Sequence, residues 1–285
     1  MKKFGLIGHP IAHSLSPALF KAGYDGRYPY GLIETADFEE AYERFLKGYD
    51  GINVTAPFKE LAIRKADILS EECRKIGATN LLVKTPEGIK AYNSDYLGVR
   101  LWLEETASIP DRKAQRLCDT FANNNPEESR SSDGARVSLT ALIVGLGGAG
   151  KAAAEAARSI GCRTILMNRT IHSDEIRPLE DFRRCFREAD IIIYNIPTAI
   201  PQLAELTDED FIGCTENGMK TSPKFILEAN YKNPSFGKAL IDRMKAKNPL
   251  LEYTSGRTWL LYQAVTGYEI FTGLKPDLAK MSAVI

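Results

Sequence analysis

The strongest constraint on the fold is a glycine-rich turn that joins a buried strand to a helix. Residues 139–144 read Leu-Thr-Ala-Leu-Ile-Val, a largely apolar run typical of a parallel strand covered on both faces. The next residues are Gly145, Leu146, Gly147, Gly148, Ala149 and Gly150, ahead of an alanine-rich helix predicted to end at Ile160. A GxGxxG spacing in this context predicts dinucleotide binding, because backbone and helix N-terminus can approach a pyrophosphate. Glycines used only for packing are the alternative.

Further strands are predicted at residues 164–167, 190–194 and 225–228. Strands and helices thus alternate along residues 137–254. This alternation predicts a Rossmann-type domain with a doubly wound parallel sheet.

A second α/β pattern occupies residues 1–105. The predicted strands are 4–8, 30–33, 51–54, 79–84 and 89–92, and the predicted helices begin near Ser16, after the Asp37-x-x-Glu40 capping box, and near Asp95. A last helix over residues 258–271 has apolar side chains on mixed faces and is expected to pack on this pattern. We therefore predict one domain from 1–105 with 255–285, and a second from 137–254.

Residues 106–136 differ in composition from both patterns. The stretch 123–134 is polar and nearly free of apolar residues, which predicts a linker or an exposed insertion. A solvated insertion without function is the simplest explanation of this segment.

Composition limits the class of partner. The 285 residues are 44% hydrophobic, enough for a large core, while Lys+Arg and Asp+Glu both number 37. Zero formal charge gives no global attraction to nucleic acid or a membrane, so a small molecule is the expected partner. The 5 cysteines include no CxxC pair, which argues against disulfides or zinc and favours the reducing cytoplasm. The sequence leaves a monomer and a homodimer open.

The N-terminus predicts neither export nor a metal site. Its apolar stretch ends at His9-Pro10, too short for the core of a signal peptide or a membrane span. His9 and His13 share a helical spacing, but Pro10 lies between them and no glutamate follows His9 as in HExxH. We therefore expect no metal.

The run from Asn53 to Lys59, Asn-Val-Thr-Ala-Pro-Phe-Lys, predicts a functional site at the end of a strand. Pro57 fits the first position of a helix expected to continue through Leu69, which puts Lys59 in the first turn. A cation there opposes the positive end of the helix dipole, so its placement costs stability unless another group compensates. A lysine at such a position usually has a function.

Polar residues at or near other strand ends extend this site. They are Ser14 and Ser16 after the first strand, Thr55, Asn80 in Gly-Ala-Thr-Asn, and Asp95 in Tyr-Asn-Ser-Asp. Hydroxyls, amides, one amine and one carboxylate suit a small polyhydroxylated molecule that carries an anionic group. Ser16 could instead serve only as a helix cap.

The cofactor type is suggested by Asn168-Arg169-Thr170, about twenty residues after the glycine turn. An NAD site usually has Asp or Glu here, for the ribose hydroxyls. Arg169 can bind a 2′-phosphate, and Asn168 and Thr170 can donate hydrogen bonds, so the motif favours NADP. A solvated arginine after a strand is the alternative.

Taken together, these motifs resemble the shikimate dehydrogenase family over the whole chain. The SxS pair, the NVTxPxK run, Asn80, Asp95, the glycine turn and Asn168-Arg169-Thr170 occur in the family's order. Gly256-x-x-Trp259-Leu260-x-x-Gln263 resembles a late motif with a substrate-binding glutamine, and Tyr231 a tyrosine after the fifth strand of the nucleotide domain.

The resemblance implies a reaction and a set of roles. The family interconverts 3-dehydroshikimate and shikimate with NADP in aromatic amino acid biosynthesis. Lys59 and Asp95 would be catalytic. Ser14, Ser16 and Tyr231 would hold the substrate carboxylate, and Asn53, Thr55, Asn80, Asp95 and Gln263 would bind the ring hydroxyls. The cofactor would contact Gly145, Gly147, Gly148, Ala149, Gly150, Asn168, Arg169, Thr170 and Gly256.

The chain departs from the family pattern in four places. Phe20-Lys21 stands where His-Asn is usual, and residues 195–201 replace the usual NATSxGM of a loop that approaches the nicotinamide. Ser173 replaces a basic residue, which leaves Arg169 as the main phosphate partner and predicts a weaker preference for NADP. The segment between Asp95 and Gly145 is also longer than typical.

Two other functions stay open at this stage. A quinate/shikimate dehydrogenase that also uses NAD would share these motifs. A non-catalytic metabolite- or nucleotide-binding regulator could have kept the fold, and the altered 195–201 loop gives that reading some support, whereas Lys59 and Asp95 argue against it.

Overall fold

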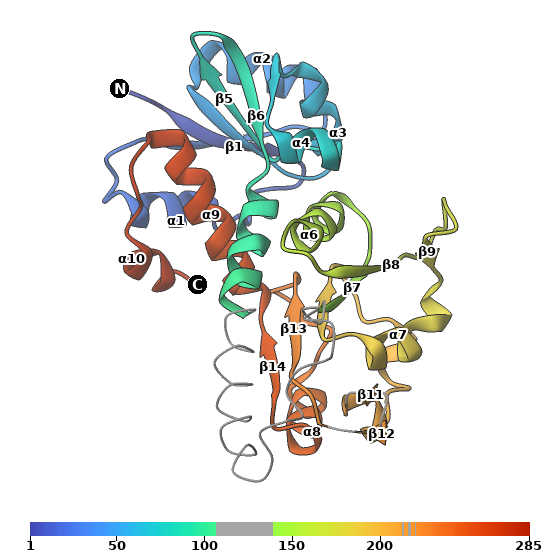
Figure 1. Cartoon of the computed structure of the whole chain (residues 1–285). Helices are drawn as coiled ribbons and strands as arrows, with labels where there is room; N and C mark the ends of the chain where they lie inside the picture. Colours follow the sequence, from blue (N-terminus) through green and yellow to red (C-terminus); the bar gives the residue numbers. More distant parts are fainter. Residues whose placement is uncertain (107–138, 213, 216–217, 220) are drawn as a thin grey trace, which may run out of the picture. The chain divides into compact units, whose positions relative to one another are not determined.

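The computed structural model describes residues 1–106, 139–212, 214–215, 218–219 and 221–285, so the predicted linker lies almost entirely outside the described residues. Contacts divide the chain into two compact units (Figure 1). Unit 1 comprises 1–99, 147–155 and 257–285, and unit 2 comprises 100–146 and 156–256. The domain limits predicted from the sequence stay a prediction.

Unit 1 is built on a mixed sheet. Its strands are β1 (Phe4–Gly8), β2 (Tyr30–Glu34), β3 (Gly51–Val54), β4 (Ile68–Leu69), β5 (Leu81–Thr85) and β6 (Gly88–Tyr92), in the order β2-β1-β3-β5-β6-β4. β1 is parallel to β2 and β3, and β4 to β6, whereas β5 is antiparallel to both neighbours. The five predicted strands are confirmed, and β4 is an addition.

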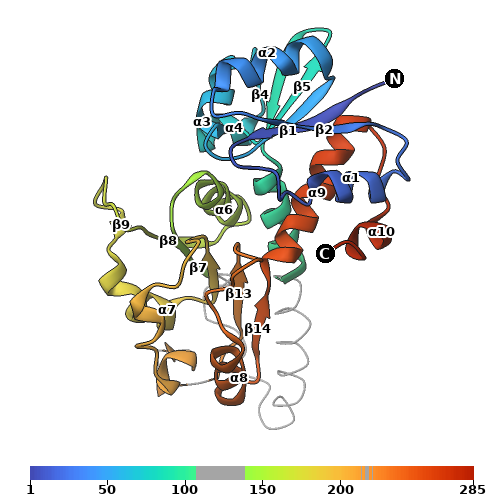
Figure 2. The same cartoon turned by 180° about the vertical axis from the view of Figure 1, so that it is seen from behind.

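Helices cover both faces of this sheet. The helices of this unit are α1 (Ser16–Gly23), α2 (Phe38–Gly48), α3 (Lys59–Ala62), α4 (Glu71–Ile76), α9 (Gly256–Thr272) and α10 (Leu278–Ser282). A further helix over 94–106 begins in this unit. α2 packs on one face through Phe38 and Phe45, and α1, α9 and α10 on the other around Phe20 (Figure 2). The expected packing of the last long helix on this unit is confirmed.

The prediction of one helix from Pro57 to Leu69 is wrong. α3 begins only at Lys59 and ends at Ala62, a 3-10 turn covers Ile63–Lys65, and Leu69 lies in β4. The chain turns back because Asp67 pairs with β6. Its backbone N–H donates to Ile89 O at 2.8 Å, and its carboxylate accepts from Ile89 N at 2.7 Å. These long-range bonds outweigh the local helical pattern.

Unit 2 has the predicted parallel sheet. Its strands are β7 (Thr140–Val144), β8 (Arg163–Met167), β9 (Ile176–Arg177), β10 (Ile191–Tyr194), β13 (Lys224–Glu228) and β14 (Leu251–Thr254), in the order β14-β13-β10-β7-β8-β9 and all parallel. Counted along the chain this is the Rossmann order 3-2-1-4-5-6, with its switch point between β7 and β10. The fold-class prediction is confirmed.

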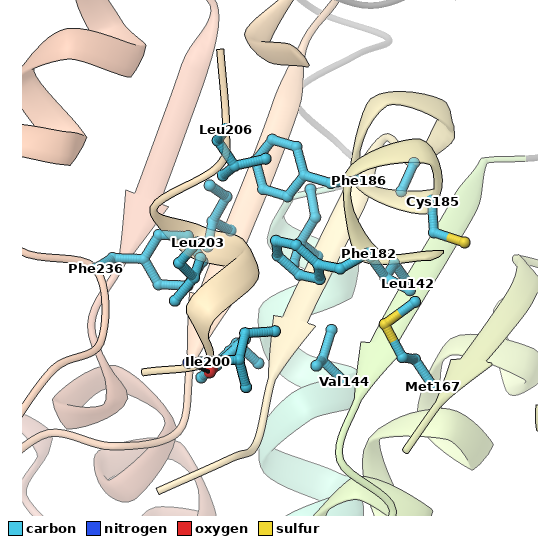
Figure 3. Packing of buried hydrophobic residues seen from close by; sticks show 14 of the residues in the cluster. Leu142, Val144, Met167, Phe182, Cys185, Phe186, Ile200, Leu203, Leu206 and Phe236 are labelled. Carbon is cyan, nitrogen blue, oxygen red and sulfur yellow. Dashed lines mark hydrogen bonds between the residues drawn. The ribbon is translucent and has the colours of Figure 1, made fainter. Parts of the chain in front are cut away.

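One face of this sheet carries an apolar core (Figure 3). Leu142 and Val144 from β7 and Met167 from β8 pack against Phe182 and Phe186. The two phenylalanines belong to α7 (Phe182–Glu188). Further described elements are α6 (Gly148–Ser159), α8 (Lys238–Lys247), the pair β11 (Cys214–Thr215) and β12 (Gly218–Met219), and 3-10 turns at Leu179–Asp181, Pro201–Leu203 and Asp208–Phe211. The strand residues that point to the opposite face of the sheet are buried too, so both faces of the sheet are covered.

A buried carboxylate, Asp210, stabilises unit 2. It accepts hydrogen bonds from Arg183 at 2.9 Å, from Arg187 at 2.6 Å and from the backbone N–H of Thr207 at 2.8 Å. Burial raises the pKa of Asp210, but these bonds outweigh burial and lower the pKa from 3.8 to about 2. A carboxylate whose pKa is lower in the folded state stabilises that state above its unfolded pKa.

Replacing Asp210 with alanine is expected to lower the free energy of unfolding by about 2 kcal/mol, because several charge-assisted bonds are lost together. The stabilisation should persist above about pH 4 and disappear as the pH falls towards 2. Urea titrations at several pH values measure both effects. Asp208→Ala, which removes an exposed carboxylate paired with Arg243 and Lys247, is the control and should change stability by less than about 0.5 kcal/mol. Equal effects of the two substitutions would contradict this account.

Candidate active site

Lys59 and Asp95 form a close ion pair in unit 1. Lys59 is the first residue of α3, and Asp95 lies in the first turn of the helix over 94–106. Lys59 Nζ lies 2.5 Å from Asp95 Oδ2, and the side chains are 18% and 13% exposed. The backbone around each is held, since Thr79 N donates to Lys59 O and Trp259 Nε1 to Asp95 O. The carboxylate is thus the group that compensates a lysine at a helix N-terminus.

Asn80, Ser94 and Gln263 form a second hydrogen-bonded group in unit 1. Asn80 Oδ1 accepts from Ser94 N at 2.7 Å, and Asn80 Nδ2 donates to Ser94 Oγ at 3.0 Å. Ser94 Oγ in turn donates to Gln263 Oε1 at 3.2 Å. A Cβ on Gly98 would lie 2.7 Å from Gln263 N, so the helix over 94–106 and α9 approach closely. Ser94 was not predicted as a site residue, although its position next to Asp95 in the sequence could have indicated it.

Ser14 and Ser16 lie together at the start of α1. Ser14 Oγ donates to Ser16 Oγ at 3.1 Å and accepts from Ser16 N at 3.2 Å. The reading of Ser16 as only a helix cap is wrong, because the N-cap position is Leu15 and no side chain caps this helix. Ser14 and Ser16 are both partly exposed, and a pair of hydroxyls can donate hydrogen bonds to an anionic group.

Two tyrosines that sequence reasoning missed donate hydrogen bonds to predicted site residues. Tyr268 OH donates to Ser16 O at 3.1 Å, and Tyr30 OH donates to Asn53 Oδ1 at 2.8 Å. Burial raises the pKa of both phenols, so both stay protonated donors at neutral pH. This bond fixes the orientation of the Asn53 amide, since its oxygen accepts from Tyr30. The amide nitrogen is then the group that can donate to a ligand.

Phe20, one of the departures from the family pattern, fixes these tyrosines. Its ring centroid lies 4.8 Å from that of Tyr30 and 4.8 Å from that of Tyr268. Thr55 lies close to Gly8, where an added Cβ would be 2.3 Å from Thr55 Cγ2. The aromatic cluster and the glycine therefore leave the polar groups little freedom to move.

The glycine turn lies at the switch point of the unit 2 sheet. Gly145 has φ +88°, a conformation that side chains other than glycine rarely adopt, and its Cβ would lie 3.0 Å from Ile196 Cγ1. At Gly147 an added Cβ would meet nothing within 4 Å, which leaves its backbone open to a ligand. Gly148 belongs to unit 1, and a Cβ added to it would lie 3.2 Å from Lys59 Cδ. Ala149 is partly buried and Gly150 is buried.

Gly256 packs against the strand end that precedes Tyr231. A Cβ on Gly256 would lie 2.3 Å from Ala229 O, so no larger residue fits. Tyr231 follows in the loop after β13 and is half-buried, which raises its pKa. Nearby, after β10, Asn195 Oδ1 is buried and has no hydrogen-bond partner among the described residues. An open glycine backbone and an unpaired acceptor at this sheet edge fit a nucleotide that brings its own donors.

Asn168 shapes the loop after β8. Its Oδ1 accepts from Leu146 N at 3.4 Å and its Nδ2 donates to Thr170 O at 3.0 Å. These bonds tie the glycine turn to the loop and leave Arg169 and Thr170 exposed. Asn168 therefore supports the loop, whereas Arg169 is available to a phosphate.

The described ranges hold neither a cluster of metal ligands nor a membrane span. Among these residues, no three or more His, Cys, Asp or Glu side chains gather as metal ligands. None of the helices in the described ranges is long and apolar enough to cross a membrane.

Comparisons with known proteins give a consistent result. Residues 6–82 match the model of the shikimate dehydrogenase substrate binding domain, and residues 112–218 match that of the D-isomer specific 2-hydroxyacid dehydrogenase NAD binding domain. The shikimate dehydrogenase (NADP(+)) of Caldicellulosiruptor saccharolyticus is 30% identical over 95% of this chain and 92% of its own length. A shikimate dehydrogenase (NADP(+)) of Thermus thermophilus is 27% identical over 99% and 96%.

Solved structures show the same fold. Shikimate 5-dehydrogenase of Thermus thermophilus in complex with NADP(H) and shikimate aligns with a TM-score of 0.71 and 25% identity, over 100% of this chain and 98% of that one. Quinate dehydrogenase of Corynebacterium glutamicum in complex with NAD gives 0.69 and 20%, over 99% and 98%. At 20% identity the second comparison shows the fold alone.

Proposed function

Because this chain belongs to the shikimate dehydrogenase family, we propose that it catalyses the reversible NADPH-dependent reduction of 3-dehydroshikimate to shikimate. The predicted family and enzyme class agree with the relatives found, which are named as NADP(+) enzymes. The observation that carries the proposal is the pair of Lys59 and Asp95, whose side chains lie 2.5 Å apart and are partly exposed. They belong to unit 1, as do all the residues proposed below to bind the substrate except Tyr231.

The pair has the chemistry that carbonyl reduction needs. NADPH supplies the hydride to the carbonyl carbon, and the carbonyl oxygen must gain a proton. In our proposal the ammonium of Lys59 gives that proton and takes it back in the reverse direction. Asp95 orients the amine and keeps its charge paired, and it also accepts a hydrogen bond from a ring hydroxyl.

The remaining residues are proposed to orient the two ligands. Ser14, Ser16 and Tyr231 would bind the carboxylate, and Asn53, Thr55, Asn80, Asp95 and Gln263 the ring hydroxyls. The glycine turn (145, 147, 148 and 150), Ala149 and Gly256 would contact the dinucleotide. Arg169 and Thr170 would recognise its 2′-phosphate, on the loop that Asn168 supports. The support is that hydrogen bonds link Ser14 with Ser16 and Asn80 with Gln263 through Ser94.

A matrix of two acids and two cofactors tests this function. Purified protein is assayed by the absorbance of the reduced nicotinamide with shikimate or quinate and with NADP or NAD. We expect the highest kcat/KM with shikimate and NADP. Higher activity with quinate would favour a quinate/shikimate dehydrogenase, and binding of shikimate by calorimetry without any turnover would favour a non-catalytic binder.

Tyr30→Phe is expected to raise the KM for shikimate about 10-fold, the effect of one lost hydrogen bond, with a smaller change in kcat. The change removes only the hydroxyl that orients the amide of Asn53. Steady-state kinetics with saturating NADP measure it. Tyr28→Phe is a matched control, since Tyr28 packs in the same aromatic cluster on Phe4 and Phe20. Equal KM values for Tyr30→Phe and the unsubstituted protein would show that the Tyr30 hydroxyl does not contribute to substrate binding.

We also propose that the protein works in the cytoplasm on small molecules, without nucleic acid or membrane partners. The support is zero formal charge and the free, buried thiols of Cys73, Cys162 and Cys185. Whether two copies associate into a homodimer is decided by analytical ultracentrifugation of the purified protein at several concentrations.

A further inference from the structure

Two loops leave the unit 2 sheet side by side, next to its switch point. The first, residues 195–201, follows β10, and the second, residues 229–236, follows β13 and contains Tyr231. β10 and β13 are adjacent parallel strands with Tyr194 opposite Glu228. The first loop also lies against the glycine turn, since a Cβ on Gly145 would contact Ile196.

The side chain of Asn230 joins these two loops. Its Nδ2 donates to Pro197 O in the first loop at 2.7 Å and to Asn233 O in its own loop at 2.7 Å. Its Oδ1 accepts from the backbone N–H groups of Lys232 and Asn233, both at 3.2 Å. An amide has two N–H donors and an oxygen with two lone pairs, so these four bonds use it completely. Asn230 is therefore not available to bind a ligand itself.

Other hydrogen bonds hold each loop to the sheet. Two of them reach a neighbouring strand, because Asn195 N donates to Val144 O of β7 and Ala229 N donates to Tyr194 O of β10, both at 2.8 Å. Tyr194 OH donates to Thr198 O at 2.8 Å and accepts from Ile200 N at 3.1 Å, which anchors the first loop to β10. The buried carboxylate of Glu228 accepts from Ser235 N and from Phe236 N, which anchors the second loop to β13. The bond from Asn230 to Pro197 adds a direct connection between the loops themselves.

We propose that Asn230 is a positioning residue, which holds the loop of Tyr231 and the loop at 195–201 in one fixed geometry. The inference rests on the proposed function, in which Tyr231 binds the substrate carboxylate, and on the family resemblance, which implies that the 195–201 loop approaches the nicotinamide. Hydride transfer requires the two reacting carbons at close range, and a misplacement of about 1 Å can cost about 10²-fold in rate. The side-chain amide of Asn230 thus links the loop that binds the substrate to the loop beside the cofactor.

Hydrogen exchange in the ligand-free protein tests the link without any assay of activity. Asn230→Asp keeps the acceptor for Lys232 and Asn233 but has no N–H for Pro197 O, whereas Asn230→Ala removes both functions. Both variants should speed amide exchange at residues 195–200 by about 10-fold, the effect of one net hydrogen bond. Only Asn230→Ala should also speed exchange at 232–233.

Asn233→Ala is the matched control, because the bonds between Asn230 and Asn233 use only the backbone of Asn233. It should leave exchange at 195–200 unchanged. Protection of β10 and β13 reports that the sheet is intact in every variant. Unchanged exchange at 195–200 in both Asn230 variants, with the sheet protected, would overturn the proposal.

A double-mutant cycle tests whether the link acts through Tyr231. Asn230→Ala and Tyr231→Phe should each lower kcat/KM for shikimate about 10-fold, and the double variant should lose less than the product of the two. Losses that multiply fully would mean that Asn230 does not act through Tyr231, against the proposal. Inactivity of the unsubstituted protein with shikimate would overturn the proposed function instead, and the exchange comparison then decides the role of Asn230 by itself.

Discussion

Replacing Lys59 with alanine is expected to slow turnover by about 10²-fold or more, the contribution of a well-placed acid-base group. The substitution removes the ammonium that faces Asp95 at 2.5 Å, and in our proposal this is the group that exchanges a proton with the substrate oxygen. The effect should fall mainly on kcat, because the serines, amides and tyrosines that hold the substrate are unchanged. Single-turnover kinetics with saturating shikimate and NADP measure the step directly.

The matched control for this variant is Lys65→Ala. Lys65 pairs with Glu39 at 2.8 Å on the exposed surface of the same unit, so the same chemical change is made outside the site. Its kcat should equal that of the unsubstituted protein. Circular dichroism must show that both variants are folded. Near-normal turnover of a folded Lys59→Ala variant would refute the acid-base role.

Asp95→Asn separates the two members of the pair. The amide keeps the shape of the carboxylate and can still accept a hydrogen bond, but it no longer neutralises the amine. We expect a smaller loss than with Lys59→Ala, and a double variant that is no worse than Lys59→Ala alone, because the residues act as one unit. A double variant with multiplied losses would show instead that the two side chains act independently.

Local sequence pattern predicted the parts of this fold that depend on neighbouring residues. The strand at 140–144, its glycine turn and the helix after it form one continuous segment, so apolar periodicity and glycine spacing were sufficient. The same holds for the helix cap, where Asp37 accepts from the backbone of Glu39 and Glu40. For the same reason Lys59 was correctly placed in the first turn of a helix.

Features that depend on distant residues were missed. β4 exists because Asp67 bonds to Ile89, a pairing that no local window contains. Tyr268 reaches Ser16 across 252 residues, and in the sequence it is simply one more aromatic residue of a helix. Tyr30 likewise looks like a strand residue, and only the fold places its hydroxyl on Asn53. Residues within recognisable motifs could be proposed for the site from the sequence, whereas the groups that hydrogen-bond to them could not.

Replacing Arg169 with glutamine is expected to lower kcat/KM with NADP by about 10²-fold and to change kcat/KM with NAD only a few-fold. A guanidinium can form two charge-assisted hydrogen bonds to the 2′-phosphate, and each loss of about 1.4 kcal/mol is about tenfold in affinity. Ser173 offers no second cation at the position where the family usually has one, so Arg169 should carry most of the discrimination. NAD lacks the phosphate, and its binding should depend on the glycine turn instead.

The structure makes this a clean test of cofactor choice. Arg169 is exposed, whereas its neighbour Asn168 supports the loop through bonds to Leu146 and Thr170, so glutamine at 169 should not disturb the glycine turn. Arg163→Gln is the control, since it makes the same change at the exposed amino end of β8 and should affect neither cofactor. Equal losses with NADP and NAD would mean that Arg169 shapes the loop rather than reads the phosphate. If kcat/KM is unchanged with both cofactors, other residues must discriminate between NADP and NAD, because an arginine that recognises the 2′-phosphate must favour the cofactor that carries it.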